Sequence, residues 1–266
     1  MLPPERKPSV PAKIAVAIPT YNKFAYARRA CLSALKHTKS PIRLYVIDDA
    51  SPKYQQQNWD LWKQGIPDDV LRFHHFEKNG GLTRSWNTAL QWAREEGCEY
   101  TVCTNSDILF TPHWEEGLLH QLDRGYHLVG PVSNAPGQTN GGRQRVGNFF
   151  PDYKVTDDAA YLAKVARYLR AKQSLDKIIG GLPINGFFMI AKTSVWWEGA
   201  FDDKHVFNPA KKMAGNEDEL ERRWRKRGFK IGFVPSSFVF HYRSVSRGDR
   251  HKQKGWHRLD DIHKAV

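Results

Sequence analysis

Cysteine is scarce in this sequence, which contains only Cys31, Cys98 and Cys103 and no CxxC pair. An odd number of thiols without paired spacing argues against a disulfide framework and against a zinc site. We therefore expect three reduced, packed thiols in a cytoplasmic protein.

Long apolar runs are also missing. No stretch approaches the roughly 20 apolar residues that a membrane-spanning helix needs. Residues 1–12 are rich in proline and basic side chains and lack the apolar core of a secretory signal, so they predict a flexible lead-in. The sequence contains no internal repeat.

Acidic residues are outnumbered by basic ones, 28 against 41, which gives a formal net charge of +13. Such an excess indicates attraction to an anionic partner, whether a nucleotide donor, an anionic membrane surface or nucleic acid. Charge alone does not choose among these partners, and many soluble enzymes are merely basic. The sequence leaves the oligomeric state undetermined.

Strand and helix patterns alternate through the first half of the chain. Helical apolar spacing is present in 24–36 and 82–93. Buried-strand patterns occupy the segments 13–18, 42–48, 70–76, 100–104 and 127–132. This alternation predicts an α/β fold with a mixed, mostly parallel central sheet flanked by helices, in a single domain.

The regular alternation breaks after the fifth predicted strand. Residues 134–183 read as an inserted lid-like segment: a loop rich in Gly, Asn and Arg, then a helix over 156–173 with Thr156 as its N-cap. The inserted segment is followed by a strand at 186–191, a helix after Glu217 and two closing strands at 230–235 and 238–242. Residues 247–266 form a basic, His-rich tail.

Acidic clusters occur where strands end or a helix begins: Asp48-Asp49, Asn105-Ser106-Asp107 and Glu217-Asp218-Glu219. Open α/β sheets bind ligands at the carboxyl ends of their strands. Carboxylates gathered there can hold a divalent cation and leave one side chain as a base, which suits chemistry on a diphosphate-linked substrate. Taken alone, Asp48-Asp49 is explained as well by turn formation, and Glu217-Asp218-Glu219 is explained better as acids at a helix N-terminus. Asn105-Ser106-Asp107 would cap the next helix less well than Thr111 and Pro112. The strand-end location that the clusters share favours a site.

Seven segments with a consistent order carry a family resemblance between Lys13 and Ser246. They are VAIPTYN, YVIDDAS, NGGLTRSWN, TNSDILF, INGFFMIAKTSVWWEGAFDD, NEDELERRWRKRGFKIGFVP and HYRSVS. Each is weak alone, but the ordered set resembles the family 2 nucleotide-sugar glycosyltransferases of the GT-A fold. The resemblance implies a glycosyltransferase domain over 13–246, containing the variable segment 134–183.

The resemblance implies contacts to a nucleotide-diphosphate sugar, most often a UDP-sugar. The residues implied to bind this donor are Pro19, Thr20, Tyr21, Asn22, Asp48, Asp49, Arg84, Asn87, Asn105, Ser106 and Arg243. Asp49, with Asp48 beside it, is similar to the family's carboxylate that reads the base or ribose.

The same resemblance implies a Mn²⁺ or Mg²⁺ ion held by Asp107 and His241, and Asp218 as the base of an inverting single displacement. Asn105 replaces the first acid of the metal-binding DxD motif, so weaker, donor-dependent metal binding is expected. A histidine on a short apolar strand such as His241 is more often a packed residue than a ligand.

Two other functions were weighed against glycosyl transfer. A sugar nucleotidyltransferase would carry a glycine-rich loop after its first strand, whereas the loop here, PTYNKFAYARR, has no glycine. A non-catalytic nucleic-acid-binding module would leave the three acidic clusters unexplained. The expected acceptor is a saccharide or glycoconjugate. Basic patches at 143–145, 222–227 and 247–254 make a hydroxylated base in DNA a second candidate.

Overall fold

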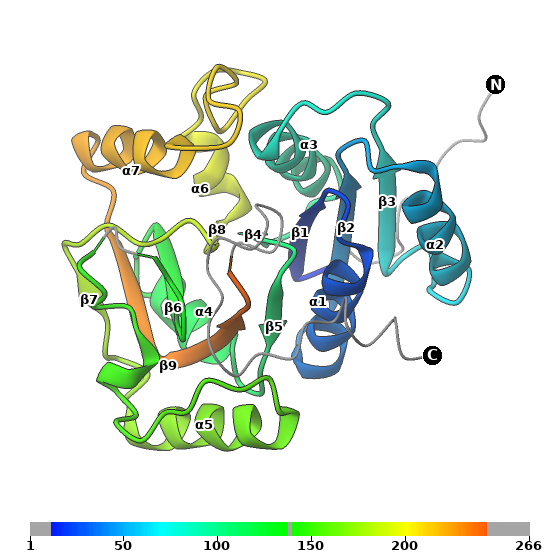
Figure 1. The fold of residues 1–266 in the computed structure, drawn as a ribbon. Coiled ribbons are helices and arrows are strands. Elements are labelled where there is room, and N and C mark those ends of the chain that lie inside the picture. Colours follow the sequence, from blue (N-terminus) through cyan, green and yellow to red (C-terminus); the bar gives the residue numbers. More distant parts are fainter. Residues whose placement is uncertain (1–11, 138–139, 244–266) are drawn as a thin grey trace.

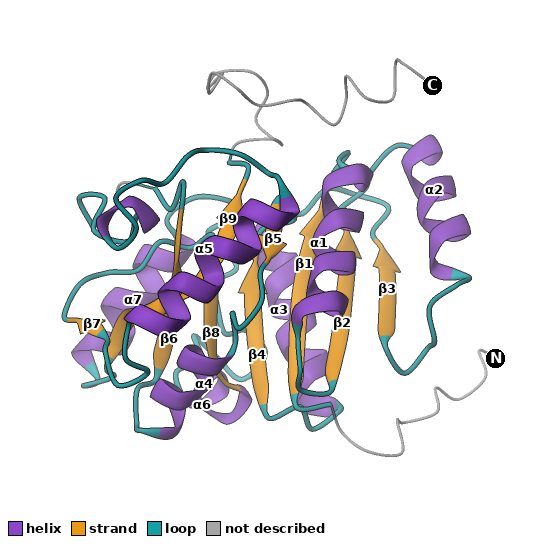
Figure 2. Cartoon of the chain, turned by 90° about the horizontal axis from the view of Figure 1, so that it is seen from below, coloured by secondary structure: helices purple, strands orange, loops and turns teal. Residues whose placement is uncertain are grey.

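The computed structural model describes residues 12–137 and 140–243. Residues 1–11 of the predicted lead-in and the whole predicted tail, 247–266, lie outside this part of the chain. Within it, one nine-stranded mixed sheet is covered by helices on both faces (Figures 1 and 2). The predicted α/β fold with a mixed central sheet is confirmed.

The first half of the chain builds the parallel part of the sheet. Strands β1 (Ile14–Thr20), β2 (Ile42–Asp48), β3 (Leu71–His75) and β4 (Tyr100–Thr104) pair in the order β3-β2-β1-β4. All three of these pairings are parallel. Helices α1 (Phe24–His37), α2 (Lys53–Lys63) and α3 (Leu82–Glu95) make the crossovers that parallel strands require.

The second half extends the sheet with antiparallel and parallel pairs. Strands β8 (Phe188–Lys192), β6 (Leu128–Ser133), β9 (Ile231–His241) and β5 (Ile108–Phe110) continue the order, and β7 (Ile179–Gly180) pairs with β9. The two closing strands predicted from sequence are one continuous strand, β9. Its register against β6 shifts between Pro131 and Val132, which accommodates the polar pair Ser236-Ser237 without ending the strand.

Four further helices and one 3₁₀ turn complete the described part of the fold. They are α4 (Glu116–Asp123), the 3₁₀ turn η1 (Val146–Asn148), α5 (Ala159–Lys172), α6 (Thr193–Glu198) and α7 (Asn216–Lys226). The helix predicted in the inserted segment is α5, but Asp158 rather than Thr156 caps it, by accepting a hydrogen bond from the Tyr161 N–H. No helix among these described elements is long and apolar enough to cross a membrane.

The core consists of two apolar layers, one on each side of the sheet. Trp86 and Leu90 of α3 pack on one face with Trp224 of α7, whereas α1 and α4 cover the other face. Every residue of β1 is buried, which explains its nearly unbroken apolar sequence. The three cysteines are free and buried, as expected, and burial raises the pKa of the Cys31, Cys98 and Cys103 thiols.

The parallel strands end at a common edge of the sheet. β1 ends at Thr20, β2 at Asp48 and β4 at Thr104, so the polar segments that follow them emerge side by side. β9 arrives at the same edge from the other end of the chain, because His241 pairs with Ile108 directly after the 105–107 segment. This convergence places the predicted site residues within reach of one another.

Candidate active site

A cavity of about 600 Å³ opens at this edge of the sheet. Its walls come from the loops after β1, β2 and β4, the N-terminal turn of α3, the 136–137 and 185–187 segments, the start of α7 and the end of β9. The predicted site residues that line it are Pro19, Thr20, Tyr21, Asp49, Asn105, Ser106, Asp107, His241 and Arg243. The cavity therefore brings together most of the predicted site residues, from four separate segments of the chain.

Asp49 organises one wall of the cavity. Its carboxylate accepts hydrogen bonds from the backbone N–H groups of Gly80 and Gly81, at 2.9 and 2.7 Å, and from the Arg84 guanidinium. Gly81 has a φ of +87°, a conformation that a side chain would disfavour, and an added Cβ would meet the Lys212 carbonyl. Asp49 thus fixes the glycine turn that leads into α3.

Asp48, predicted to contact the nucleotide, does not line the cavity. Its side chain is fully buried, and it accepts hydrogen bonds from Ser51 and pairs with Nδ1 of His75 at 2.9 Å. Alternation along β2 explains the difference, since consecutive side chains point to opposite sides of a strand. Asp48 therefore stabilises the turn after β2, and Asp49 alone faces the cavity.

Two hydroxyl groups in the cavity wall have no hydrogen-bond partner among the described residues. Thr20 is 3% exposed and Ser85 is 1% exposed, and the hydroxyl oxygens of both are buried at the cavity lining. Buried hydroxyls normally find partners. A ligand carrying hydroxyl or phosphate oxygens in this cavity would supply them. Asn22, by contrast, does not line the cavity and bonds to Ser51 and Tyr54 instead.

Asp107 and His241 face each other across the cavity floor. Oδ1 of Asp107 lies 3.2 Å from Nε2 of His241, and both side chains are buried. Nδ1 of His241 lies 2.9 Å from the Ala135 carbonyl oxygen, which can only accept, so Nδ1 carries the proton. In a neutral imidazole Nε2 is then an acceptor. It lies 3.4 Å from Nδ2 of Asn105, which can donate to it only over a long distance, and at 3.2 Å it faces a second acceptor, Oδ1 of Asp107.

Two facing acceptors are a favourable arrangement only when a cation or a proton lies between them. A histidine that donates its other N–H to a backbone carbonyl is the usual geometry of a metal ligand. Carboxylate oxygen and imidazole nitrogen both suit Mn²⁺, so these two residues fit the ion that the resemblance implies. No cluster of three His, Cys, Asp or Glu side chains exists within the described ranges, so a donor's phosphate oxygens would have to complete the coordination.

The structure brings Glu217, not the predicted base Asp218, to the cavity. Glu217 lines it and packs against Gly186, where an added Cβ would lie 2.8 Å from Cδ of Glu217. Asp218 is exposed and lies outside the lining. The reason is helical phase: Glu217 precedes the buried residues Leu220 and Trp224 by three and seven positions, whereas Asp218 points away.

The inserted segment supports the remaining wall through Gln144, which is fully buried. Its Oε1 accepts from the backbone N–H and the side-chain amide of Asn185, both at 3.0 Å, and from Nδ2 of Asn140 at 3.1 Å. Its Nε2 donates to the Pro131 carbonyl at 2.7 Å. Gln144 therefore ties the insert to β6 and positions Asn185, a cavity residue that was not among the predicted site residues.

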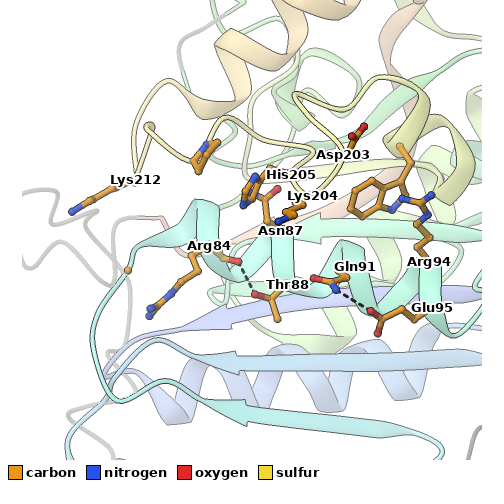
Figure 3. Close-up of a pocket in the computed structure, with 13 residues that line it drawn as sticks. Arg84, Asn87, Thr88, Gln91, Arg94, Glu95, Asp203, Lys204, His205 and Lys212 are labelled. Carbon is orange, nitrogen blue, oxygen red and sulfur yellow. Dashed lines mark hydrogen bonds between the residues drawn. The ribbon is translucent and has the colours of Figure 1, made fainter.

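Arg84 and Asn87, both predicted to bind the donor, line a second cavity of about 870 Å³ on the outer face of α3 (Figure 3). Asn87 is engaged on both sides of its amide: Oδ1 accepts from the Val206 and Phe207 N–H groups, and Nδ2 donates to the Phe207 carbonyl. It serves as a clamp between α3 and the segment before α7. Arg84 reaches the first cavity only through its bond to Asp49.

A family model for glycosyl transferase family 2 matches residues 15–196 of the chain. That range holds most of the parallel sheet, Asp49 and the 105–107 segment. The chain belongs to glycosyl transferase family 2. The match ends before Glu217 and His241, whose placement at the same cavity comes from the structure. No curated protein sequence matches this family 2 chain significantly.

Solved glycosyltransferase structures share the fold of this family 2 chain at low sequence identity. A Pyrobaculum calidifontis mannosyltransferase, PcManGT, in complex with GDP-Man and Mn²⁺ is 16% identical, with a TM-score of 0.58 over 88% of this chain and 58% of its own. GalNAc-T7 with UDP, GalNAc and Mn²⁺ is 16% identical, with a TM-score of 0.60 over 88% and 44%. Staphylococcus aureus TarS 1-349 in complex with UDP is 15% identical, with a TM-score of 0.54 over 86% and 60%. The chain thus covers less than two thirds of each.

Proposed function

We propose that this chain is an inverting hexosyltransferase that moves a sugar from a nucleotide-diphosphate donor, with UDP-sugars favoured, to an acceptor hydroxyl. One observation carries the proposal: Asp49, Asp107, Glu217 and His241, from four separate parts of the chain, line a single cavity at the carboxyl edge of the parallel strands. The Mn²⁺ and nucleotide ligands named for PcManGT and GalNAc-T7 support it.

The donor would lie along the wall formed by Asp49 and the glycine turn. Pro19, Thr20 and Tyr21 would contact the nucleoside, and the unpartnered hydroxyls of Thr20 and Ser85 would bond to its oxygens. Arg243, which also lines the cavity, would pair with the phosphates. A divalent cation on Asp107 and His241 would neutralise charge on the leaving diphosphate when bound.

Glu217 is the residue that we assign as base, in place of Asp218. Of the carboxylates in the cavity lining, Asp49 is bonded to Gly80, Gly81 and Arg84, and Asp107 faces His241. Glu217 lies in the first turn of α7 and lines the same cavity. There it can accept the proton of an acceptor hydroxyl as the oxygen attacks the anomeric carbon, so that the configuration inverts in one displacement.

The acceptor that we propose is a saccharide or glycoconjugate, with a hydroxylated DNA base as the second candidate. We also propose that residues 13–246 form the glycosyltransferase domain and that 134–183 is its variable acceptor-side segment. Support comes from Pro136 and Gly137, which belong to this segment and line the cavity beside Asn185 and Gly186.

A donor panel tests the proposal directly. Thermal unfolding is measured with UDP, GDP and their sugar conjugates, each with and without Mn²⁺. A true donor at 100 times its Kd stabilises the folded state by about 2.7 kcal/mol. We expect a UDP-sugar to do so only when Mn²⁺ is present. If no nucleotide sugar raises the unfolding temperature under any condition, the proposed function is wrong.

A further inference from the structure

The second cavity, which we call the α3 cleft, has walls from two elements. One wall is the outer face of α3, where Arg84, Thr88, Gln91 and Glu95 recur at helical spacing. The other is the loop before α7, which carries Asp203, Lys204 and Lys212 (Figure 3). Its volume of about 870 Å³ is in the range of small-molecule sites.

Both walls are held rigidly by contacts that do not involve the side chains of Arg94, Lys204 and Lys212. Asn87 clamps residues 206–207 onto α3 through three hydrogen bonds. At the other end the backbone N–H of Thr83 donates to the Lys212 carbonyl at 3.2 Å, and Nδ2 of Asn216 donates to the Thr83 hydroxyl at 3.1 Å. The α3 cleft therefore exists before any ligand binds.

The loop that carries Lys204 is itself a fixed turn. Oδ1 of Asp202 accepts hydrogen bonds from the backbone N–H groups of Lys204 and His205, both at 2.8 Å. The Phe201 N–H donates to the His205 carbonyl at 2.8 Å. The ammonium group of Lys204 is thus carried on a short, ordered scaffold at the mouth of the α3 cleft.

Three cations of the α3 cleft have no carboxylate partner in the part of the chain that the structure describes: Arg94, Lys204 and Lys212. Many arginines elsewhere do have one, as in the pairs of Arg29 with Asp157 and Arg43 with Glu96. The Arg94 guanidinium lies 4.7 Å from the centre of the Trp197 ring, which fixes its plane. Its N–H edge is left for an oxyanion.

The α3 cleft also contains hydrogen-bond acceptors. The carboxylates of Glu95 and Asp203 line it together with the Gln91 amide, which donates to Glu95 at 2.9 Å. Carboxylates accept hydrogen bonds from hydroxyl groups and repel any anionic group placed directly beside them, as the densely charged backbone of a polyphosphate or phosphodiester chain would be. A pure polyphosphate or a phosphodiester chain would therefore be disfavoured, whereas a neutral sugar would leave the three cations unneutralised.

We propose that the α3 cleft binds an acidic saccharide, with its carboxylate or other anionic group on Arg94 and Lys204 and its hydroxyls on Glu95 and Asp203. Arg84 and Arg94 lie ten residues apart on α3, or about 15 Å along the helix axis. This length accommodates more than one sugar ring, so the ligand class is an acidic oligosaccharide.

The α3 cleft adjoins the donor cavity, because Gly81 lines the donor cavity and lies in close contact with the Lys212 carbonyl. Resting on the proposed glycosyltransferase function, we assign the α3 cleft as the site that anchors the part of an acidic acceptor remote from its reacting hydroxyl. Lys212 and the following residues up to Glu217 connect the two sites.

The test uses binding rather than turnover, so that it stands apart from the donor experiment. Trigalacturonate, its neutral methyl ester, tripolyphosphate and duplex DNA are titrated calorimetrically into the intact protein, without donor. We expect trigalacturonate to bind at least tenfold more tightly than the ester or tripolyphosphate. Arg94→Gln and Lys204→Gln should each lower the affinity for trigalacturonate at least tenfold. The matched control Lys164→Gln on α5 should leave this affinity unchanged.

Several outcomes would overturn the assignment. Tighter binding of tripolyphosphate or DNA would show a polyanion site, and equal binding of the neutral ester would show that charge is not recognised. Displacement of trigalacturonate by a UDP-sugar with Mn²⁺ would place it in the donor cavity. Because Lys204 is exposed, loss of folding is not expected for Lys204→Gln. No binding of trigalacturonate, combined with normal donor binding, would reject the α3 cleft and leave the proposed function intact.

Discussion

Oδ1 of Asp107 lies 3.2 Å from Nε2 of His241, with both side chains buried and Nδ1 of the histidine bonded to the Ala135 carbonyl. This arrangement joins the end of β4 to the end of β9. It makes a histidine that in sequence resembles an ordinary packed residue one half of the cation site that we propose. The other half is the only acid of the 105–107 segment.

The first prediction concerns that pair. Asp107→Ala and His241→Ala should each abolish the Mn²⁺-dependent part of the thermal stabilisation by a nucleotide sugar, because each removes one of two protein ligands. Stabilisation by saturating donor with Mn²⁺ should then equal that without it. A variant that keeps its full Mn²⁺ response would show that the ion is not bound there. Asp176→Ala, at an exposed carboxylate remote from the cavity, serves as the control.

The second prediction separates two neighbouring acids. Glu217→Gln should lower kcat by about 100-fold or more, the usual contribution of a general base, and leave donor affinity nearly unchanged. Asp218→Asn should leave kcat within a few-fold of the wild type, because Asp218 is exposed and outside the cavity. Single-turnover kinetics with saturating donor would distinguish them. The reverse ranking would return the role of base to Asp218.

The third prediction contrasts the consecutive residues Asp48 and Asp49. Asp48→Asn should lower the free energy of unfolding by about 1–3 kcal/mol, since it weakens buried bonds to Ser51 and His75, but donor affinity should persist. Asp49→Asn should weaken donor binding, because the Asn amide has one acceptor oxygen where the carboxylate has two, so one of the two N–H groups of the glycine turn loses its acceptor. Urea unfolding and calorimetric donor titration measure the two effects. Loss of donor affinity only in Asp48→Asn would contradict the assignment.

The fourth prediction is a pH dependence of stability caused by Glu221. Burial raises the pKa of Glu221 from 4.5 to about 8, and the Arg225 guanidinium and the Ile184 N–H offset this only in part. Because the folded state holds this proton more tightly than the unfolded chain does, its contribution to stability is complete below pH 4.5. That contribution is lost as the pH rises to about 8.

Glu221→Gln has no carboxylate to ionise at this position. The variant should therefore lose less stability than the wild type as the pH rises from 4.5 to about 8, and above pH 8 it should be the more stable of the two proteins. The neutral amide oxygen can still accept from the Ile184 N–H. The measurement is urea unfolding of both proteins between pH 5 and pH 9, compared as a difference so that other titrating groups cancel. A constant difference across this range would show that Glu221 is ionised throughout in the folded protein.

The alternating strand and helix patterns were sufficient to predict the parallel half of the sheet, because each of those elements has its own apolar period. They did not show that 231–241 is one strand, since the polar residues Ser236 and Ser237 resemble a break. Pairing with β6 on one side and with β5 and β7 on the other keeps this strand continuous.

Residues that line the cavity were predictable where a motif follows a strand, as for Asp49 and Asp107. The choice between adjacent acids was harder. Glu217 lies three residues before Leu220 and seven before Trp224, which is the spacing of one helix face. The sequence therefore already indicated that Glu217, rather than Asp218, lies on the inward face of the helix. No comparable signal marks Asn185, because its position depends on the buried amide of Gln144 in another segment.

The sequence by itself determined the fold class and the edge of the sheet at which chemistry is expected, because these follow from local periodicity and from polar residues at strand ends. Its ordered motifs also resembled the family that the family model then showed. Tertiary structure decided which of those polar residues meet. Asp48 turned inward, Glu217 faced the cavity and His241 reached Asp107, since side-chain direction is set by strand alternation, helix phase and long-range pairing. The α3 cleft likewise exists only because Asn87 holds a distant loop against its helix.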